Sequence, residues 1–388
     1  MIVLDKLPEQ TSALRHIEYE LIDNVGKTIK LPNEYVPSFE CFFKRHTPTV
    51  MGSLLYIDRL DLSKQIDLKT SSVKVYYIDL FNKMFFRTFK IININEIKSE
   101  NGLKMFEFKL RDSVSYFLDN LYISKSFTGS RVSALSQIFS EYNLSSKLTE
   151  TKLKFQTEDD GIKGNLVLNK NLSVLDFFEK EFHRIGYSFY QDKSGMYVKN
   201  KENLLPGKIP EITAAFSQRI TNQFYKNKIY EIITVPTSKE EIDKQPKQQS
   251  FYYDIEKRQM VSINTNIGSL QSEITLNKDN SDIQETVGFK AKFQNRSDSA
   301  QQKSEIIDQF LKLSTSKIVV NGYVDNDINK IVDLEILGEK GNNKSHLAGD
   351  IVSSGKYIIL SVIDKIVADK MLQLIEVGRS DTGKVGKA

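Results

Sequence analysis

Apolar and polar residues alternate along the first 125 residues in a pattern that predicts strands with short connections. Between His16 and Ile22 the apolar residues stand at positions 17, 19 and 21, a period of two that is typical of a sheet with one solvent-exposed face. Ser53–Ile57 predicts another strand. The stretch from 73 to 97 is rich in Tyr, Phe and Ile, and its length predicts two strands joined near Asn82 and Lys83.

The pair Asn101 and Gly102 predicts a β-hairpin turn of type I′, because both central residues of that turn take positive φ. Ile92 and Ile94 alternate with polar residues before the pair, and Met105–Leu110 alternates after it. We therefore expect two paired strands on either side of this turn.

From residue 126 to residue 205 the apolar spacing becomes helical. A first helix is predicted by one apolar face, formed by Val132, Leu135, Phe139 and Tyr142. A second helix is predicted to begin after Ser173 as N-cap, with Asp176 three residues later, and to end at Gly186. Its apolar stripe consists of Leu175, Phe178, Phe182 and Ile185. Tyr187–Tyr190 and Met196–Val198 then predict a hairpin across 192–195, which completes a small α/β module.

Strand character returns at 206–235, where Lys228–Val235 is the best example. The segment 236–250 is rich in Lys, Glu and Gln and predicts a solvated loop, followed by short strands as far as Phe293. A third helix is predicted from Asp298 to Leu313. The final part predicts four strands, of which the last two pair around Ala368–Lys370: Lys317–Val320, Lys330–Leu337, Lys356–Ile363 and Met371–Val377.

Composition is that of a soluble, core-forming protein, with 388 residues, 40% hydrophobic and 27% charged. The sequence contains no apolar run long enough to span a bilayer, and its first residues do not resemble a secretory signal, so no membrane anchor is expected. The 54 basic and 50 acidic residues are interspersed, which does not indicate a surface that coats nucleic acid. The 23 Phe and 17 Tyr residues suit half-buried strands.

Residues that could carry chemistry are scattered. Cys41 is the single cysteine, which excludes an internal disulfide, and its place between Phe39 and Phe43 favours a packed, inert thiol. No two of the four histidines have the spacing of a helical metal site: His16, His46, His183 and His346. His183 is expected on the solvated face of the second helix.

Two acidic segments superficially resemble functional sites. The carboxylates of Asp159 and Asp160 precede Gly161, and this arrangement is more typical of a turn than of a glycosidase acid pair. The segment Asp325–Asn329 resembles the start of an EF-hand loop, but Lys330 replaces the glycine and Ile336 replaces the closing glutamate. A polar hairpin connection is expected there.

The sequence contains neither a Walker loop nor a Gly-x-Ser-x-Gly elbow, and the Gly and Lys residues of 383–387 are wrongly ordered for a phosphate-binding loop. We therefore predict no catalytic residues, no cofactor-binding residues and no metal ligands, and we do not expect an enzyme.

The order of the predicted modules, at this length, resembles a known family. Ser130–Phe139 looks like the family's first inserted helix, and Asn171–Tyr187 is similar to its segment in which Leu-Ser precedes a helix and Gly precedes an aromatic residue. The helix at 298–313, the Val319–Gly322 strand and the Lys356–Arg379 hairpin follow the family order. The chain thus resembles the baseplate central hub protein of contractile-tailed, T-even-type phages and the related hub portion of type VI secretion spike proteins. Asp364 stands near a position where members often carry a histidine.

The resemblance implies a β-rich α+β fold with two tube-like antiparallel β-barrel domains, an inserted small α/β module and a further insertion. The implied domains are 1–125 for the first tube-like domain, 126–205 for the α/β module, 206–235 with 308–380 for the second tube-like domain, 236–307 for the insertion and 381–388 for a flexible tail.

The resemblance also implies a structural function in the virion tail baseplate, after assembly in the host cytoplasm. A homotrimer would form a pseudo-hexameric ring that joins the six-fold tail tube to the three-fold central spike. DNA would pass through its channel without specific binding. The implied partners are the central spike protein, the tail tube or tube-initiator protein and the baseplate wedge proteins, and the hub itself has no enzymatic activity.

Two alternatives remain open at this stage. The first is another tail component, such as a distal tail or tube-initiator protein, which ranks below the hub. The second is a glycan-binding or carbohydrate-active β protein whose Tyr and Phe side chains stack on sugars, although the absence of Trp speaks against this.

Overall fold

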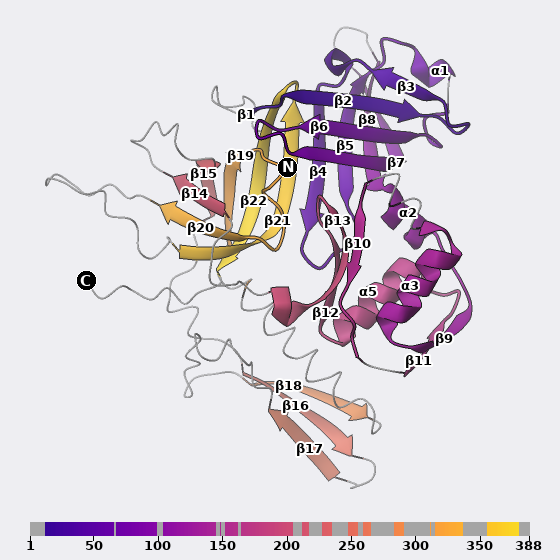
Figure 1. Ribbon diagram of the computed structural model, residues 1–388, viewed down its shortest axis with the longest axis vertical. Helices are drawn as coiled ribbons and strands as arrows, with labels where there is room; N and C mark the ends of the chain where they lie inside the picture. The colour runs from indigo at the N-terminus through magenta and orange to yellow at the C-terminus, as the bar shows by residue number, and fades with distance from the viewer. Residues whose placement is uncertain are drawn as a thin grey trace, which may run out of the picture.

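Most of the described strands belong to one continuous fourteen-stranded sheet, which two β modules share (Figure 1). The computed structural model describes residues 12–65, 67–98, 104–144, 148, 152–161, 164–204, 212–216, 227–234, 247–254, 259–264, 283–290, 311, 315–336 and 355–379. Strands dominate and the helices are short, so the β-rich α+β prediction is confirmed at this level.

The first β module contains seven strands, the 3-10 helix η1 and the helix α1. Their bounds are β2 His16–Ile22, β3 Thr28–Leu31, η1 Asn33–Tyr35, β4 Ser38–Lys44, β5 Met51–Ile57, α1 Leu62–Gln65, β6 Ser72–Ile78, β7 Met84–Lys98 and β8 Lys104–Asp112. Ile17, Tyr19 and Leu21 of β2 are buried while the residues between them are more exposed, which confirms the predicted period of two. The turn predicted at Asn101 and Gly102 lies outside the described residues, and β7 and β8 on either side of it pair antiparallel as expected.

The second β module forms a closed circuit of six strands. Their bounds are β14 Ile212–Phe216, β15 Asn227–Thr234, β19 Thr315–Asn321, β20 Ile331–Ile336, β21 Gly355–Val367 and β22 Lys370–Arg379. Pairing runs from β21 to β22, β19, β15, β14 and β20, and from β20 back to β21. The short strand β1 (Ser12–Ala13) adds to β22. The predicted hairpin around Ala368 is confirmed, and Ala368 takes a positive φ of 55°.

The prediction of a wholly antiparallel second β domain is wrong. β14 runs parallel to both of its neighbours, β15 and β20. Parallel neighbours need a connection long enough to bring the chain back to the same end of the sheet. The ten residues of 217–226 and the insertion before β20 supply that length.

The two β modules meet edge to edge, because β4 of the first module pairs antiparallel with β21 of the second. In this pairing Cys41 stands opposite Asp364 and Phe43 opposite Val362. One continuous hydrophobic core accompanies the joined sheet and includes residues from Leu14 to Val377. The two modules are therefore packed on a common core rather than linked by a loose connection.

The α/β module lies against the ends of the first-module strands, with its helices gathered on the side away from β21 and β22 (Figure 1). Its elements are α2 Ser113–Asp119, β9 Lys125–Gly129, α3 Arg131–Glu141, β10 Lys154–Thr157, β11 Gly164–Leu168, α5 Val174–Arg184, β12 Tyr187–Gln191, β13 Gly195–Asn200 and the 3-10 helix η2 Lys201–Leu204. A separate hydrophobic core fills it and already includes Val114 and Leu118 of α2, upstream of residue 126.

Helix α5 follows the sequence prediction closely. The Ser173 hydroxyl accepts the backbone N–H of Asp176, and Gly186 takes a positive φ of 79° where the helix ends. All four residues of its predicted apolar stripe are buried. In α3 the prediction is wrong for Tyr142, which caps the C-terminus and is 37% exposed, because the helix ends one residue earlier.

The insertion contributes a three-stranded sheet of β16 (Lys247–Asp254), β17 (Gln259–Asn264) and β18 (Ile283–Lys290). The prediction of a loop through residue 250 is wrong at its end, because β16 begins at Lys247 and pairs with both other strands. In β16, backbone pairing with two neighbouring strands favours a strand despite the polar side chains of its first residues. Apart from Leu311, the helix predicted at 298–313 lies outside the described residues.

Candidate functional site

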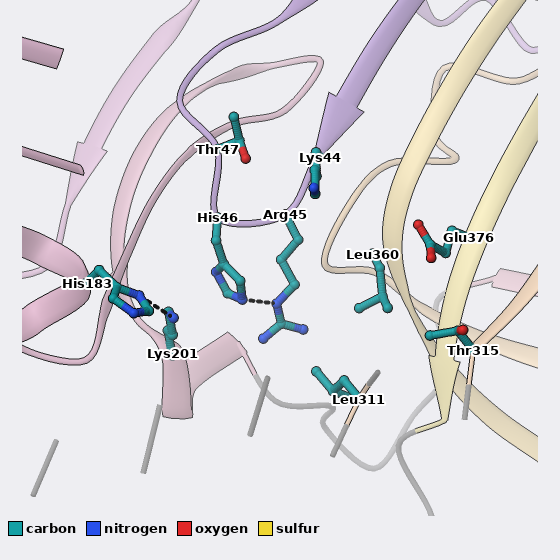
Figure 2. Close-up of a pocket in the computed structure, with 10 residues that line it drawn as sticks. All are labelled: Lys44, Arg45, His46, Thr47, His183, Lys201, Leu311, Thr315, Leu360 and Glu376. Carbon is teal, nitrogen blue, oxygen red and sulfur yellow. Dashed lines mark hydrogen bonds between the residues drawn. The ribbon is translucent and has the colours of Figure 1, made fainter. Parts of the chain in front are cut away.

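Two of the four histidines line one pocket at the boundary of the three modules. His46 follows β4, and His183 lies at the end of α5 (Figure 2). The pocket has a volume of about 500 Å³. His183 is exposed, as expected, but its Nδ1 also accepts a hydrogen bond from Lys201 Nζ at 3.2 Å. His16 lies 3.5 Å from Glu18 on the exposed side of β2, and His346 lies outside the described residues.

Within the described part of the chain, no group of three or more His, Cys, Asp or Glu side chains is placed to hold a metal ion. Cys41 is fully buried in β4, which confirms the prediction of a packed thiol. Burial raises the pKa of the Cys41 thiol well above its usual value, so the reactive thiolate is suppressed.

The acidic pair at 159–160 forms a turn, as predicted. The Asp159 carboxylate accepts the backbone N–H of Gly161, which has a positive φ of 61°. Asp160 is buried, and its Oδ2 accepts the backbone N–H of Arg131 at 2.9 Å, at the start of α3. Both carboxylates therefore have structural roles in the connection between β10 and β11, where Asp160 also binds the first residue of α3.

The segment Asp325–Asn329 differs from its prediction. It connects β19 to β20, and these strands do not pair with each other, so the connection is not a hairpin. The centre of this connection is buried, since Asn326 and Asp327 are 1% and 6% exposed. Asn326 Nδ2 donates to Gln373 Oε1 at 2.8 Å, which fixes the connection against β22.

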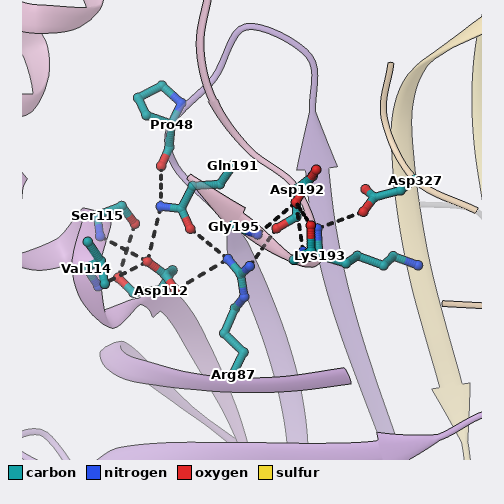
Figure 3. A network of polar contacts seen from close by, with 11 residues as sticks. Pro48, Arg87, Asp112, Val114, Ser115, Gln191, Asp192, Lys193, Gly195 and Asp327 are labelled. Atoms are coloured by element: carbon teal, nitrogen blue, oxygen red, sulfur yellow. Dashed lines mark hydrogen bonds and ion pairs between the residues drawn. The ribbon is translucent and has the colours of Figure 1, made fainter. Parts of the chain in front are cut away.

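Asp327 belongs to a set of buried polar residues that we call the polar junction. Its members come from all three modules and are Arg87, Asp112, Gln191, Lys193, Asp327 and Asp364. Figure 3 shows five of them around the turn between β12 and β13, where the α/β module inserts between the two β modules, and the sixth, Asp364, contacts Lys193 of this turn. Each of the six residues is at most 6% exposed.

The first half of the polar junction ties this turn to the first β module. Arg87 Nη1 donates to Gln191 Oε1 at 2.8 Å, and Nη2 donates to the carbonyl of Asp192 at 2.7 Å (Figure 3). Arg87 also forms a buried ion pair with Asp112 at 3.4 Å. Gln191 Nε2 donates to Asp112 Oδ1 and to the carbonyl of Pro48. Asp112 in turn caps α2 by accepting the N–H groups that open this helix.

The second half ties the same turn to the second β module. The backbone N–H of Lys193 donates to Asp327 Oδ2 at 2.8 Å. The Nζ of Lys193 lies 2.9 Å from Asp364 Oδ1 and 3.3 Å from the carbonyl oxygen of Tyr323. Asp364 also accepts hydrogen bonds from Tyr77 at 2.7 Å and from the Gln373 side chain at 2.6 Å.

Burial sets the protonation of this half. Loss of hydration, reinforced by the carboxylate of Asp192, raises the pKa of Asp327 to about 8, although Lys193 opposes the shift. Burial, followed by the charge of Asp364, raises the pKa of Tyr77 well above its usual value, so Tyr77 remains a hydrogen-bond donor. Because these groups are enclosed, the arrangement is suited to fixing three modules in one geometry and not to meeting a substrate.

The sequence contained a signal for part of the polar junction. Arg87 shares its side of β7 with the buried residues Phe85 and Phe89, and Asp364 shares its side of β21 with Val362 and Ile366. A charge at an inward position of a strand predicts a buried partner. Nothing in the local pattern identifies that partner, because Lys193 is 171 residues away from Asp364 in sequence.

No helix among the described residues combines the length and apolar character required to cross a membrane. No protein-family model matches the sequence, and no curated protein sequence matches it either.

Solved structures do match the fold. The tail protein from Neisseria meningitidis MC58 is similar with a TM-score of 0.60 at 12% identity, covering 94% of this chain and 96% of the other. The 43 kDa tail protein of prophage MuSo2 from Shewanella oneidensis is similar with a TM-score of 0.57 at 10% identity, covering 95% of this chain and 99% of the other. A chain of the half-lidded PdpA–VgrG complex of Francisella gives 0.52 at 13% identity, covering 95% of this chain and 59% of that one. Along nearly its whole length, this chain has the fold of phage tail proteins.

Proposed function

We propose that this chain is the central hub of a contractile phage tail baseplate, a structural protein that joins a six-fold tail tube to a three-fold spike. One observation carries the proposal. The fold extends over 94% and 95% of this chain in two phage tail proteins, and over 95% in a chain of a complex that contains VgrG. The same fold thus occurs in two phage tail proteins and in a chain of a complex that contains VgrG.

The arrangement of the two β modules supports a pseudo-hexameric ring. In this proposal the closed circuit of the second module and the run β4-β5-β8-β7-β6-β2-β3 of the first would each act as one tube-like β domain. Three copies would therefore present six such domains around an axis, matching six-fold symmetry on one side and three-fold symmetry on the other.

A hub must keep its two β domains in a fixed relation while the tail contracts. The shared core, the β4–β21 pairing and the polar junction supply this rigidity. Two packed modules with hydrogen-bonded, buried charges between them have one favourable relative position, because displacement would leave those charges unpaired.

The partners in this proposal are the central spike protein, the tail tube or tube-initiator protein and the wedge proteins of the baseplate. DNA would pass through the channel without specific binding, which suits a formal net charge of +4 spread over 54 basic and 50 acidic residues. The protein would act in the virion after assembly in the host cytoplasm. It would perform no catalysis itself, and any cell-wall cleavage would belong to the spike.

The proposal is tested by the mass of the purified protein in solution, measured by light scattering, alone and after co-expression with the neighbouring candidate spike protein. A particle of three times the 44.5 kDa chain mass, or a complex of three hubs with three spikes, would support the hub.

Other masses would favour other functions. A six-fold ring without affinity for a spike would favour a distal tail or tube-initiator protein. A monomer at high concentration in both conditions would contradict the hub, and binding or hydrolysis on a glycan panel would then be the next measurement.

A further inference from the structure

The lysine–carboxylate pair of the polar junction is enclosed by protein. Lys193 Nζ lies 2.9 Å from Asp364 Oδ1, and the two side chains are 2% and 0% exposed. In each of the other lysine–carboxylate pairs formed between described residues, both side chains are at least 24% exposed. An amine and a carboxyl group that touch and are shielded from water are the reactants of an amide bond. This pair therefore has a chemistry that the surface pairs lack.

Apolar and aromatic side chains surround the pair. The Nζ of Lys193 lies 5.8 Å from the centre of the Phe43 ring. Val362 and Ile366, which share the side of β21 that carries Asp364, are fully buried. Burial disfavours the charged forms of both groups. Transfer of one proton from the ammonium group to the carboxylate removes both charges at once and leaves a neutral amine beside a neutral acid. A desolvated, neutral lysine amine is a nucleophile.

Neighbouring groups hold both reactants in place. The carbonyl oxygen of Tyr323 lies 3.3 Å from the amine nitrogen. On the acid, Gln373 Nε2 donates to Oδ1 at 2.6 Å and the Tyr77 hydroxyl donates to Oδ2 at 2.7 Å. A nitrogen in contact with one carboxyl oxygen lies roughly 3 to 4 Å from the carboxyl carbon, close to the distance from which attack occurs. A small rotation about the broad χ2 torsion of the aspartate then turns the face of the carboxyl group toward the amine.

We propose that the folded chain joins Lys193 and Asp364 by an intramolecular amide bond, an isopeptide bond, for which the observed ion pair is the starting state. In this step the lysine Nζ forms a bond to the aspartate Cγ, and the bond from Cγ to Oδ1 breaks. Of the three protons on the ammonium group, one remains on the amide nitrogen and two leave with Oδ1 as water. Atoms and charge therefore balance within the pair.

The surroundings favour this step in two ways. The Tyr77 hydroxyl stabilises the negative charge that develops on Oδ2 when the amine attacks, and Oδ2 becomes the amide oxygen. The enclosed site also excludes the water that would hydrolyse the product.

The bond would tie the turn between β12 and β13 covalently to β21, over a sequence separation of 171 residues. A link that closes so long a loop restricts the unfolded chain and leaves the folded geometry unchanged. Both reactants belong to one chain, so the proposal does not depend on the hub function or on the oligomeric state.

The test is mass spectrometry of the full chain, denatured after purification in the folded state. We expect a mass lower than that of the sequence by one water molecule. Trypsin does not cleave at an acylated lysine, so a digest should contain the segments 185–199 and 357–365 as one linked species. The full sequence mass, unchanged after prolonged incubation of the folded protein, overturns the proposal. Loss of water without the linked species also overturns it, because a cyclic imide at another aspartate has the same mass.

Variants assign the chemistry to these side chains. Lys193→Arg keeps the positive charge but replaces the nucleophilic amine by a guanidinium group, and it should retain the full sequence mass. The matched control is Lys74→Arg, since Lys74 lies 3.0 Å from Glu20 at a partly exposed site, and this variant should still lose water. Tyr77→Phe keeps the ring but removes the donor to Oδ2, so the linked species should form at least about tenfold more slowly. Loss of water in Lys193→Arg overturns the proposal. If Lys193→Arg does not fold, the presence or absence of the linked species in the wild type decides the question.

Discussion

Lys193 and Asp364 form an ion pair in the interior, with side chains that are 2% and 0% exposed. Removing two charges from water is costly, and the cost is offset here by further hydrogen bonds from Tyr77 and Gln373 to the carboxylate. A buried pair of this kind contributes little net stability compared with apolar residues of the same shape. Its effect is to favour one arrangement of the modules over others, because any displacement would leave a buried charge without its partner.

Replacing one partner should therefore be strongly destabilising. Lys193→Met keeps the length of the side chain but leaves Asp364 without its cation, and we expect the free energy of unfolding to fall by about 3 to 5 kcal/mol. Urea titration measures the change. Lys64→Met is the matched control, since that lysine is 66% exposed and should change stability by less than about 0.5 kcal/mol. A loss below about 1 kcal/mol for Lys193→Met would contradict a tight junction.

Asp327 makes stability depend on pH. Its pKa rises from an ordinary value of 3.8 to about 8 on folding, so the folded protein holds a proton that the unfolded chain releases. This contribution is complete below pH 3.8 and is lost as pH rises toward 8. Relative to Asp327→Asn, which cannot titrate, the wild type should lose up to about 1.4 kcal/mol of unfolding free energy per pH unit within this window. Parallel pH profiles of the two proteins would show that Asp327 is ionised in the fold.

At the residue scale, the sequence predicts environments set by adjacent residues better than environments set by distant contacts. Cys41 and the Asp159–Asp160 pair were predicted correctly because their immediate neighbours determine their environment. The polar neighbours of Asp327 in sequence predict a polar hairpin connection. The burial of Asp327 arises from contact with Lys193, 134 residues away, which no local pattern contains.

At the scale of elements, the hairpin of β12 and β13 connects the two cores. Tyr190 and Tyr197 belong to the core of the joined β modules, while Phe189, Met196 and Val198 belong to the core of the α/β module. Successive side chains of a strand point to opposite faces, so one hairpin with apolar residues on both faces packs into two cores at once. The hairpin thus positions the turn that carries Lys193.

Gly195 gives a test of this packing. A Cβ at this position would lie 2.4 Å from the carbonyl oxygen of Lys154 on β10, so Gly195→Ala must push two strands apart. We expect a loss of about 1 to 3 kcal/mol in unfolding free energy, measured by urea titration. Gly164→Ala is the control, since its Cβ would meet no atom within 4 Å, and it should be nearly neutral. Equal stability of the two variants would show that β10 and β13 are not tightly packed.

Most elements were predictable because their signals are local. Ser173 and Gly186 mark the ends of α5, and the alternation around Tyr19 marks β2. Pairing partners were not predictable in the same way. The parallel pairing of β14 with β20 and the pairing of β4 with β21 join segments more than a hundred residues apart. Alternation of apolar residues reveals which face of a strand is buried, but not which strand lies alongside it.

At the scale of the whole molecule, one sheet of fourteen strands joins two β modules in a fixed order, and the α/β module is locked between them through the polar junction. In the proposed hub, these two β modules would act as two tube-like domains per chain, which is the geometric requirement for matching three-fold to six-fold symmetry. The order of modules was readable from the sequence, whereas their edge-to-edge junction required the structure.

The most direct test of the proposed hub is single-particle electron microscopy of the purified particle viewed along its axis. We predict a ring of three chains in which six β domains surround a channel, with true three-fold symmetry and a nearly six-fold outline. A ring of six chains, or particles that show one chain and no channel, would contradict the proposed hub.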